Sequence, residues 1–424
     1  MCSWVMKGRS DGVRCGAIGL LLASVGLLAP VHGAVVAWGY NGYGQTNVPA
    51  GLESVEAVSG GGGNNLVLKR DGTVVEWGDN TYHQTNVPAG LGNVVAVSAG
   101  TSHSLALRAD GVIVGWGDNW AGQTNSPPDV GQVVAISAGG SHNLALRADG
   151  TVAAWCANTS GQTNVPSGLH NIVAISAGGS HSLALQADGS VLAWGENFYG
   201  QINVPQGLSN VVAIQAGSSH SLARTADGKV MAWGMNAWGQ SKSPADIKPA
   251  SGIAAGAGHN LAIQPGGTVF AWGLNYDGET RTPPELTNVV SVDAGDFHNI
   301  VLVGEGSPSV RTRLLDRTGA LGGTSIFYVE ATGANPMAFQ WKHDGTNLLG
   351  ATEAALVLAD LQVSQAGIYQ VDVTNQYGAG RSSEAVLALV ENRSCTNVLP
   401  GMLAWWAGEN NGHDQVGGHD AAVV

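Results

Sequence analysis

A repeat of 39 residues limits what this 424-residue chain can fold into more strongly than any other feature. Tryptophan recurs at this interval, with nothing inserted, at Trp38, Trp77, Trp116, Trp155, Trp194, Trp233 and Trp272. Histidine keeps the same interval at His103, His142, His181, His220, His259 and His298. Asn64 occupies the first histidine slot. A period between about 20 and 50 residues is typical of solenoids, propellers and arrays of small units.

One copy, residues 135–155, reads AISAGGSHNLALRADGTVAAW. Its short apolar runs predict three β-strands, and the Asp149–Gly150 pair predicts a two-residue hairpin turn, because glycine accepts a positive φ. The segment GQTNVP that follows predicts a short fourth strand at an outer edge, since Pro166 has no amide donor. Glycine is abundant (63 residues) and charged residues are few (12%), which favours an all-β chain. Four antiparallel strands form one blade of a β-propeller.

The phase of the repeat at its two ends favours a closed ring. Six whole copies lie between two fragments, VVAWGYNGYGQTNVP at 35–49 and VVSVDAGDFHNIVLV at 289–303. These fragments are complementary parts of one copy. Joined, they would form a blade that ties the start of the repeat region to its end and removes open strand edges. The sequence therefore predicts an all-β, seven-bladed propeller with a composite closing blade over residues 34–304.

Residues 1–33 have the pattern of a secretory signal peptide. Basic residues precede an apolar run at 16–29, and small residues follow it. An uncleaved anchor is the alternative. The run is shorter than the roughly 20 residues that span a bilayer, and no later segment reaches that length, so we expect no transmembrane anchor in this chain. The pattern predicts a secreted or cell-surface protein.

The charge of the chain argues against a nucleic-acid partner. Removing the leader takes away Lys7, Arg9, Arg14 and Asp11, which changes the formal net charge from −13 to −15. Affinity for phosphate backbones comes mainly from clustered basic side chains. We therefore expect an extracellular protein or a glycan as the partner.

The motifs AGxxHSLAL, DGxVxAWG and NxxGQ resemble the regulator of chromosome condensation propeller repeat over residues 35–303. The form is the short one of secreted bacterial proteins such as the propeller-type β-lactamase inhibitory protein. The resemblance implies a seven-bladed propeller whose face loops bind other proteins. We do not expect the exchange-factor activity of nuclear members, because the chain is acidic and begins with a secretory leader.

The repeated histidines could form a metal or catalytic ring, or they could be part of the framework. Two ligands of one zinc ion lie about 3.3 Å apart, whereas packed sheets lie about 10 Å apart, so equivalent histidines cannot share an ion. We expect them to satisfy loop backbone groups, and the repeated tryptophans to pack between blades. The sequence predicts no catalytic residue, cofactor or metal site, and hence no enzyme.

Aromatic side chains follow the WGxN motif in six of the seven copies. They are Tyr40, Tyr43, Tyr82, Trp120, Phe198, Tyr199, Trp238 and Tyr276. Repeats place equivalent loops on one rim, so these side chains could form a ring of exposed aromatics typical of a binding hot spot. Alternatively, each aromatic packs on a neighbouring turn. The AGxxH loops carry mostly small residues, which argues against β-lactamase inhibition.

Two further segments follow the repeats. Residues 308–391 resemble an immunoglobulin-like domain, with Trp341 and Tyr369 at its signature positions and valines, Val329 and Val371, in place of the disulfide. Residues 395–424 resemble the truncated start of a concanavalin- or laminin-G-like domain; a disordered tail is the alternative. The predicted function is protein recognition by a secreted non-enzymatic binding protein. The alternatives are glycan binding or adhesion through the truncated domain, and inhibition of an extracellular hydrolase.

Overall fold

The computed structural model describes residues 34–390. The predicted signal peptide and the predicted truncated domain at 395–424 lie outside the described residues. Strands dominate, joined by two short 3₁₀ turns, Pro265–Gly267 (η1) and Val363–Gln365 (η2). None of the helical segments in residues 34–390 is long and apolar enough to cross a bilayer. The all-β prediction is confirmed.

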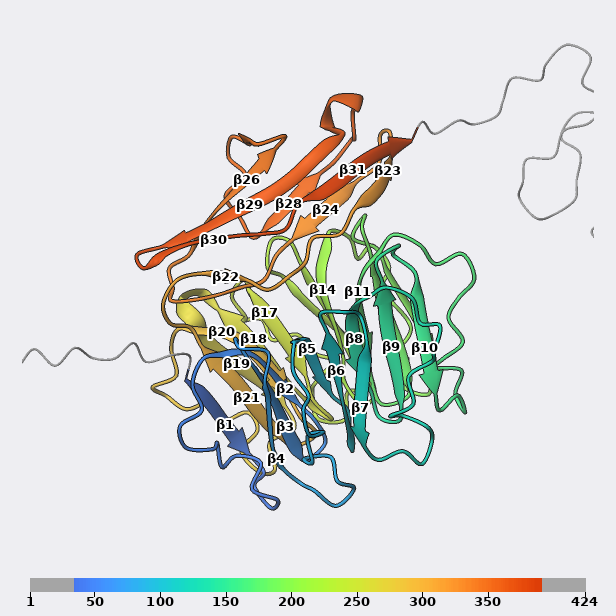
Figure 1. Cartoon of the computed structure of the whole chain (residues 1–424), viewed down its shortest axis with the longest axis vertical. Coiled ribbons are helices and arrows are strands. Elements are labelled where there is room, and N and C mark those ends of the chain that lie inside the picture. The colour runs from blue at the N-terminus through green and yellow to red at the C-terminus, as the bar shows by residue number, and fades with distance from the viewer. Residues whose placement is uncertain (1–33, 391–424) are drawn as a thin grey trace, which may run out of the picture. The chain divides into compact units, whose positions relative to one another are not determined.

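The repeat region folds into three-stranded antiparallel sheets (Figure 1). Six of them follow the chain order: β2 (Val55–Gly60), β3 (Asn64–Lys69), β4 (Val74–Gly78); β5 (Val94–Ala99), β6 (His103–Arg108), β7 (Ile113–Gly117); β8 (Val133–Ala138), β9 (His142–Arg147), β10 (Val152–Cys156); β11 (Ile172–Ala177), β12 (His181–Gln186), β13 (Val191–Gly195); β14 (Val211–Ala216), β15 (His220–Thr225), β16 (Val230–Gly234); β17 (Gly252–Ala255), β18 (His259–Gln264), β19 (Thr268–Gly273). A seventh sheet combines β1 (Val35–Gly39) with β20 (Val289–Ala294) and β21 (His298–Val303).

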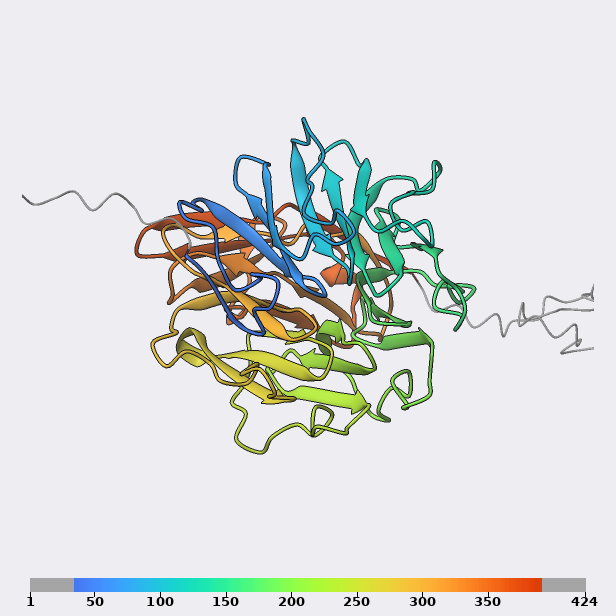
Figure 2. The same ribbon diagram turned by 90° about the horizontal axis from the view of Figure 1, so that it is seen from below.

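The seventh sheet joins the two ends of the repeat region. β1 pairs antiparallel with β21, with Trp38 opposite Asn299. The middle strand of each sheet contacts the first strand of the next sheet, from β3 with β5 round to β21 with β2. Figure 2 shows the sheets following one another around a common centre. The fold is therefore a closed β-propeller.

Packing between neighbouring sheets follows an alternation of side chains along the middle strands, which reads Leu-Ala-Leu in β6, β9 and β12. Leu144 and Leu146 belong to a buried cluster with Trp194 of the following sheet. Ala145, between them, belongs to a cluster with Leu105 of the preceding sheet. Successive side chains of a strand point to opposite faces, so β9 presents large residues forward and a small one backward. In β3 and β21 a valine takes the place of the alanine.

The hairpin turn differs from the predicted two-residue form. Residues 148–150 form a three-residue loop, closed by a hydrogen bond from Arg147 N to Thr151 O at 2.9 Å. Gly150 takes a φ of +76°, and the Asp149 carboxylate accepts hydrogen bonds from the Thr151 backbone N and hydroxyl. These two bonds hold Asp149 outside the left-handed conformation that a type I′ turn requires at both central residues.

The predicted fourth strand is also wrong. The GQTNVP segments are turns, and each sheet has three strands. In the N-terminal fragment at 35–49, backbone bonds run locally from Gly44 N to Asn41 O and from Asn47 N to Gly44 O. Some backbone groups of this segment are thus used within the loop, Gln45 O accepts hydrogen bonds from side chains of the next sheet, and no ladder to the third strand forms.

Residues 309–390 form further strands: β22 (Ser309–Val310), β23 (Arg317–Ala320), β24 (Ser325–Tyr328), β25 (Ala331–Thr332), β26 (Ala338–His343), β27 (Thr346–Asn347), β28 (Ala355–Leu358), β29 (Gly367–Asn375), β30 (Gly378–Arg381) and β31 (Ala385–Val390). The largest sheet has the order β23-β31-β29-β26-β27, with β30 beside β29. Trp341, Tyr369, Val329 and Val371 are buried in one core cluster. The immunoglobulin-like assignment stays a prediction.

Candidate protein-binding face

Two sets of loops lie at the same end of the propeller sheets. The inner loops join the first and second strands (the AGxxH motif), and the outer loops follow the third strand (the WGxN motif). The third strand ends where the second begins, as in the pairing of Gly195 with His181. Both sets therefore share one face, which we name the loop face.

Backbone hydrogen bonds connect the inner loops of all seven sheets into a ring. Seven such bonds form the ring. In six of these bonds the donor is the backbone N of the residue after the motif glycine, and the acceptor is the backbone O of a glycine in the next loop, as from Gly140 N to Gly178 O at 3.0 Å. At the boundary into the seventh sheet, Ala257 N donates to Asp296 O at 3.3 Å, and Asp296 N closes the ring onto Gly61 O at 3.2 Å. A Cβ atom on Gly100 would lie 2.7 Å from Gly139 O. The motif glycine is needed because neighbouring loops approach this closely.

Each repeated histidine links two sheets through its side chain. His103 Nε2 lies 2.7 Å from Asn143 Oδ1, and His142 Nε2 lies 3.0 Å from the Ser182 hydroxyl. The same link joins the remaining four histidines to the next sheet at Ser221, Asn260, Asn299 and Asn65. Asn143 Oδ1 is an acceptor, so Nε2 carries the proton of a neutral ring.

Burial keeps these rings neutral. It lowers the pKa of His142, His220 and His259 to about 4, and that of His181 and His298 to about 3. A neutral imidazole that is fully buried and already hydrogen-bonded has no access to a substrate. The histidines therefore serve the contact between sheets.

A glutamate replaces the histidine link in the first whole copy, where Asn64 stands in the histidine slot. Glu76 Oε1 accepts hydrogen bonds from Asn64 Nδ2 and from the Ser104 hydroxyl of the next sheet, both at 2.6 Å. Glu76 Oε2 accepts one from Trp116 Nε1 at 2.8 Å. Burial raises the pKa of this carboxyl to about 7, against the opposing effect of the three donors.

The tryptophans lie in the framework below the outer loops. Trp77 Nε1 donates to Gln45 O at 3.0 Å, and Asn65 Nδ2 donates to the same oxygen at 2.6 Å. The Gln45 side chain accepts a hydrogen bond from Tyr43 N at 2.9 Å, and Asn41 Oδ1 accepts one from Thr46 N at 2.9 Å. The outer loop is thus fastened at its base while its tip projects.

Most of the predicted aromatic residues project from these fastened loops into solvent. Trp120 is 92% exposed, Phe198 80% and Tyr276 79%. Trp238 is the least exposed of those on the surface, at 39%. The remaining members are also accessible: Tyr43, Tyr82 and Tyr199 are exposed, and Tyr40 is half-buried. The structure places all eight predicted residues on the loop face.

Some of these aromatics support one another in pairs. Phe198 and Tyr199 meet edge-on, with ring centroids 4.8 Å apart, and Tyr40 and Tyr43 do so at 6.0 Å. The outer loop that follows Cys156 carries no aromatic residue. The loop face therefore has six aromatic loops and one gap.

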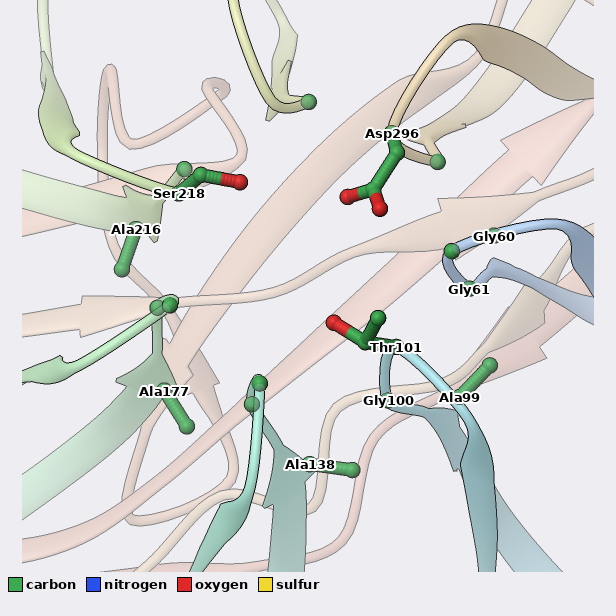
Figure 3. A pocket seen from close by; sticks show the side chains of 18 of the residues that line it. Gly60, Gly61, Ala99, Gly100, Thr101, Ala138, Ala177, Ala216, Ser218 and Asp296 are labelled. Atoms are coloured by element: carbon green, nitrogen blue, oxygen red, sulfur yellow. The ribbon is translucent and has the colours of Figure 1, made fainter. Parts of the chain in front are cut away.

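A small cavity lies on the axis, between the inner loops. Its volume is about 70 Å³, and mostly glycine and alanine line it. Three longer polar side chains from different loops, Thr101, Ser218 and Asp296, point into it (Figure 3). Burial raises the pKa of the Asp296 carboxyl to about 6. The cavity thus combines one carboxyl group with two hydroxyl groups.

Sequence reasoning missed three acidic residues of this framework. Glu76 stands where the other copies have alanine or glycine, and Asp296 stands in a slot of small residues. Asp293 stands where the first four whole copies have serine, and it accepts hydrogen bonds from the Ser59 hydroxyl at 3.1 Å and from Gly60 N at 3.0 Å. Comparing the copies position by position would have found all three.

The comparisons with known proteins agree with this architecture. The Regulator of chromosome condensation (RCC1) repeat matches five segments: residues 94–123, 133–162, 172–201, 211–240 and 251–279. The fold is an RCC1-type β-propeller. Prp20p of Saccharomyces cerevisiae, described with its binding properties to Gsp1p and histones, is 18% identical, with a TM-score of 0.56; the match covers 65% of this chain and 92% of Prp20p. Yeast RCC1 (Prp20) in complex with Kap60 is 18% identical, with a TM-score of 0.55, over 71% of this chain and 96% of that chain. No curated relative matches the chain.

This geometry is suited to recognition. RCC1-type propellers are a binding or exchange-factor fold, which suggests protein–protein binding in general. Within residues 34–390, no group of three or more His, Cys, Asp or Glu side chains is placed to hold a metal ion. The accessible side chains of the loop face include the outer-loop aromatics and several acidic residues, on a backbone fixed by the repeat.

Proposed function

We propose that this chain is a secreted, non-enzymatic binding protein, and that its RCC1-type propeller recognises another protein through the loop face. The observation that carries the proposal is the set of exposed aromatic side chains on six of seven outer loops. Aromatic residues dominate binding hot spots, because they bury much apolar area at a low cost in side-chain entropy.

The rigidity of the loops supports recognition by a preformed surface. Each aromatic projects from a loop that recurring asparagine and glutamine side chains hold at its base, such as Asn197 and Gln201 below Tyr199. Little ordering is then needed on binding, which favours affinity. The acidic net charge of −13 supports a protein partner rather than a nucleic acid.

The test is capture of the partner by the purified full chain. We would immobilise it and compare extracellular protein retained by the natural chain and by a Trp120→Ala, Tyr199→Ala, Tyr276→Ala variant. The matched control is Val112→Ala, an exposed apolar residue in the hairpin turn at the opposite end of its sheet. Loss of specific partners in the triple variant alone supports the proposal. Equal capture by all three proteins contradicts it.

Secretion is tested separately. The sequence of residues 1–33 supports an exported chain that is cleaved after Gly33. N-terminal sequencing of protein from the culture medium should start at Ala34. Recovery of the uncleaved chain within cells alone contradicts this part of the proposal.

A further inference from the structure

The axial cavity of the loop face contains a carboxylate that has no partner. Within residues 34–390, no side chain or backbone group donates a hydrogen bond to the Asp296 carboxylate, and burial is the sole cause of its raised pKa of about 6. By contrast, Asp293, three residues earlier, accepts hydrogen bonds from Ser59, Gly60 and its neighbour Ala294. A half-buried carboxylate to which no protein group donates is stabilised when a cation comes to it.

The oxygens around the cavity match one type of cation. The side chains of Thr101, Ser218 and Asp296 point toward the same space from three different inner loops (Figure 3). A single carboxylate balances a single positive charge. The set offers at least three acceptor oxygens, and a primary ammonium group has three N–H donors and no acceptor. A divalent ion such as Ca²⁺ prefers six to eight oxygen ligands.

The size of the cavity fits the end of an alkylammonium chain. A water molecule needs about 10–15 Å³ by the same measure. A volume of about 70 Å³ therefore accepts an ammonium group with part of its methylene chain. The alanine and glycine lining leaves room along the axis, where longer side chains would fill it.

The charge of the surrounding face favours a basic group as well. Aspartate and glutamate outnumber lysine and arginine on its loops. The acidic side chains are Asp79, Asp118, Glu196, Asp277, Glu279 and Asp296, and the basic ones are Lys242 and Arg281. Fields of one sign at a recessed site raise the local concentration of the opposite charge.

We propose that the axial cavity binds a primary ammonium group, and that a lysine side chain of the protein partner supplies it. The lysine occupies the centre of the loop face, and the aromatic outer loops surround it. The source of the ammonium group rests on the proposed function; the ammonium site itself does not. Asp296 pairs with the positive charge, and Thr101 and Ser218 accept the remaining N–H groups.

The test uses the purified full chain and three probes: n-butylammonium chloride, n-butyltrimethylammonium chloride and potassium chloride. Ligand-observed NMR should show saturable binding of n-butylammonium, and weak or no binding of the quaternary ion, which has no N–H donor. Asp296→Asn should weaken n-butylammonium binding at least about tenfold, because hydrogen bonds to a charged group are among the strong ones. Thr101→Val should weaken it by about fivefold. Asp110→Asn, which removes an exposed charge from a hairpin turn at the opposite end of the sheets, should leave it unchanged.

Two results would overturn the ammonium site: equal binding by Asp296→Asn and the natural chain, or equal binding of potassium and n-butylammonium. Thermal unfolding of Asp296→Asn checks that the propeller remains folded. If it does not, Thr101→Val alone decides, and unchanged binding by that folded variant overturns the site.

A further probe distinguishes the source of the group. The peptide acetyl-Gly-Lys-Gly-amide should bind at least as tightly as n-butylammonium. Binding of the free amine without binding of the peptide overturns the lysine assignment. The proposed function fails separately: the triple aromatic variant would then capture the same partners as the natural chain, while n-butylammonium still bound.

Discussion

The Glu76 carboxylate accepts a hydrogen bond from the Ser104 hydroxyl at 2.6 Å, across the boundary between two propeller sheets. In the other six copies a histidine makes the corresponding link to a serine or asparagine of the neighbouring sheet. Asn64 cannot reach across, and it donates to Glu76 instead. Two substitutions in one copy, at positions 64 and 76, thus compensate each other.

The first prediction follows from this pair. Glu76→Ala should lower the free energy of unfolding by about 2–4 kcal/mol, since it leaves Asn64 Nδ2 and the Ser104 hydroxyl without partners. Adding Asn64→His to Glu76→Ala recreates the arrangement of the other copies and should recover most of the loss. Urea unfolding of both variants measures this. A double variant as unstable as Glu76→Ala would show that the two positions act independently.

The repeat predicted the framework because the period places each strand and each inter-sheet contact in register. It could not predict the turn between strands, because the choice depends on whether the Asp149 side chain bonds Thr151. Nor could it predict whether the aromatics of the outer loops face solvent. Loop periodicity says that Trp120 and Tyr276 share a rim, but packing against neighbours decides their exposure.

The spatial neighbours of Asp296 were also beyond the reach of sequence reasoning. The residue is visible in the sequence as an exception among small residues, yet its neighbours Thr101 and Ser218 lie 195 and 78 positions away. Closure of the ring brings them together. Aligning the copies position by position finds exceptional residues such as Asp296. The structure of the closed ring shows which other residues line the same cavity.

The second prediction concerns acid. The buried histidines have folded-state pKa values of about 3 to 4, below their ordinary value of 6.5. Between these folded-state values and pH 6.5, the unfolded chain therefore binds more protons than the folded chain. Their contribution to stability is complete above pH 6.5 and is lost as the pH falls toward 4. The raised pKa values of Glu76, about 7, and of Asp293 and Asp296, about 6, act in the opposite direction.

Because the histidines are more numerous and more strongly shifted, we expect the free energy of unfolding to fall between pH 6.5 and pH 4. His142→Asn places the residue of the first copy in this slot, and it should reduce the pH dependence by about one proton. Urea unfolding at several pH values measures both effects. An unchanged pH dependence in His142→Asn would contradict the assignment.

The third prediction concerns Cys156, which holds a φ of +85° at a position where the other copies have glycine. This conformation costs a residue with a Cβ about 1–2 kcal/mol. Cys156→Gly should therefore raise the free energy of unfolding by up to about 1 kcal/mol, after the entropy that glycine loses on folding. The reverse change, Gly195→Cys, should destabilise the chain, because its Cβ would lie 2.7 Å from Ser180 O. Thermal unfolding that gave both variants the same sign would refute this reading.

The last prediction separates two sets of aromatic residues that recur with the same period. Trp116 is buried, and its Nε1 donates to Gln84 O at 2.8 Å, whereas Trp120, four residues later, is 92% exposed. Trp116→Ala should cost about 3–5 kcal/mol of unfolding free energy through the cavity it leaves. Trp120→Ala should change it by less than about 0.5 kcal/mol, because an exposed side chain loses little packing. Urea unfolding measures both. If Trp120→Ala destabilised the chain as much as Trp116→Ala, its side chain would belong to the framework, and the loop face would lose the most exposed member of its binding surface.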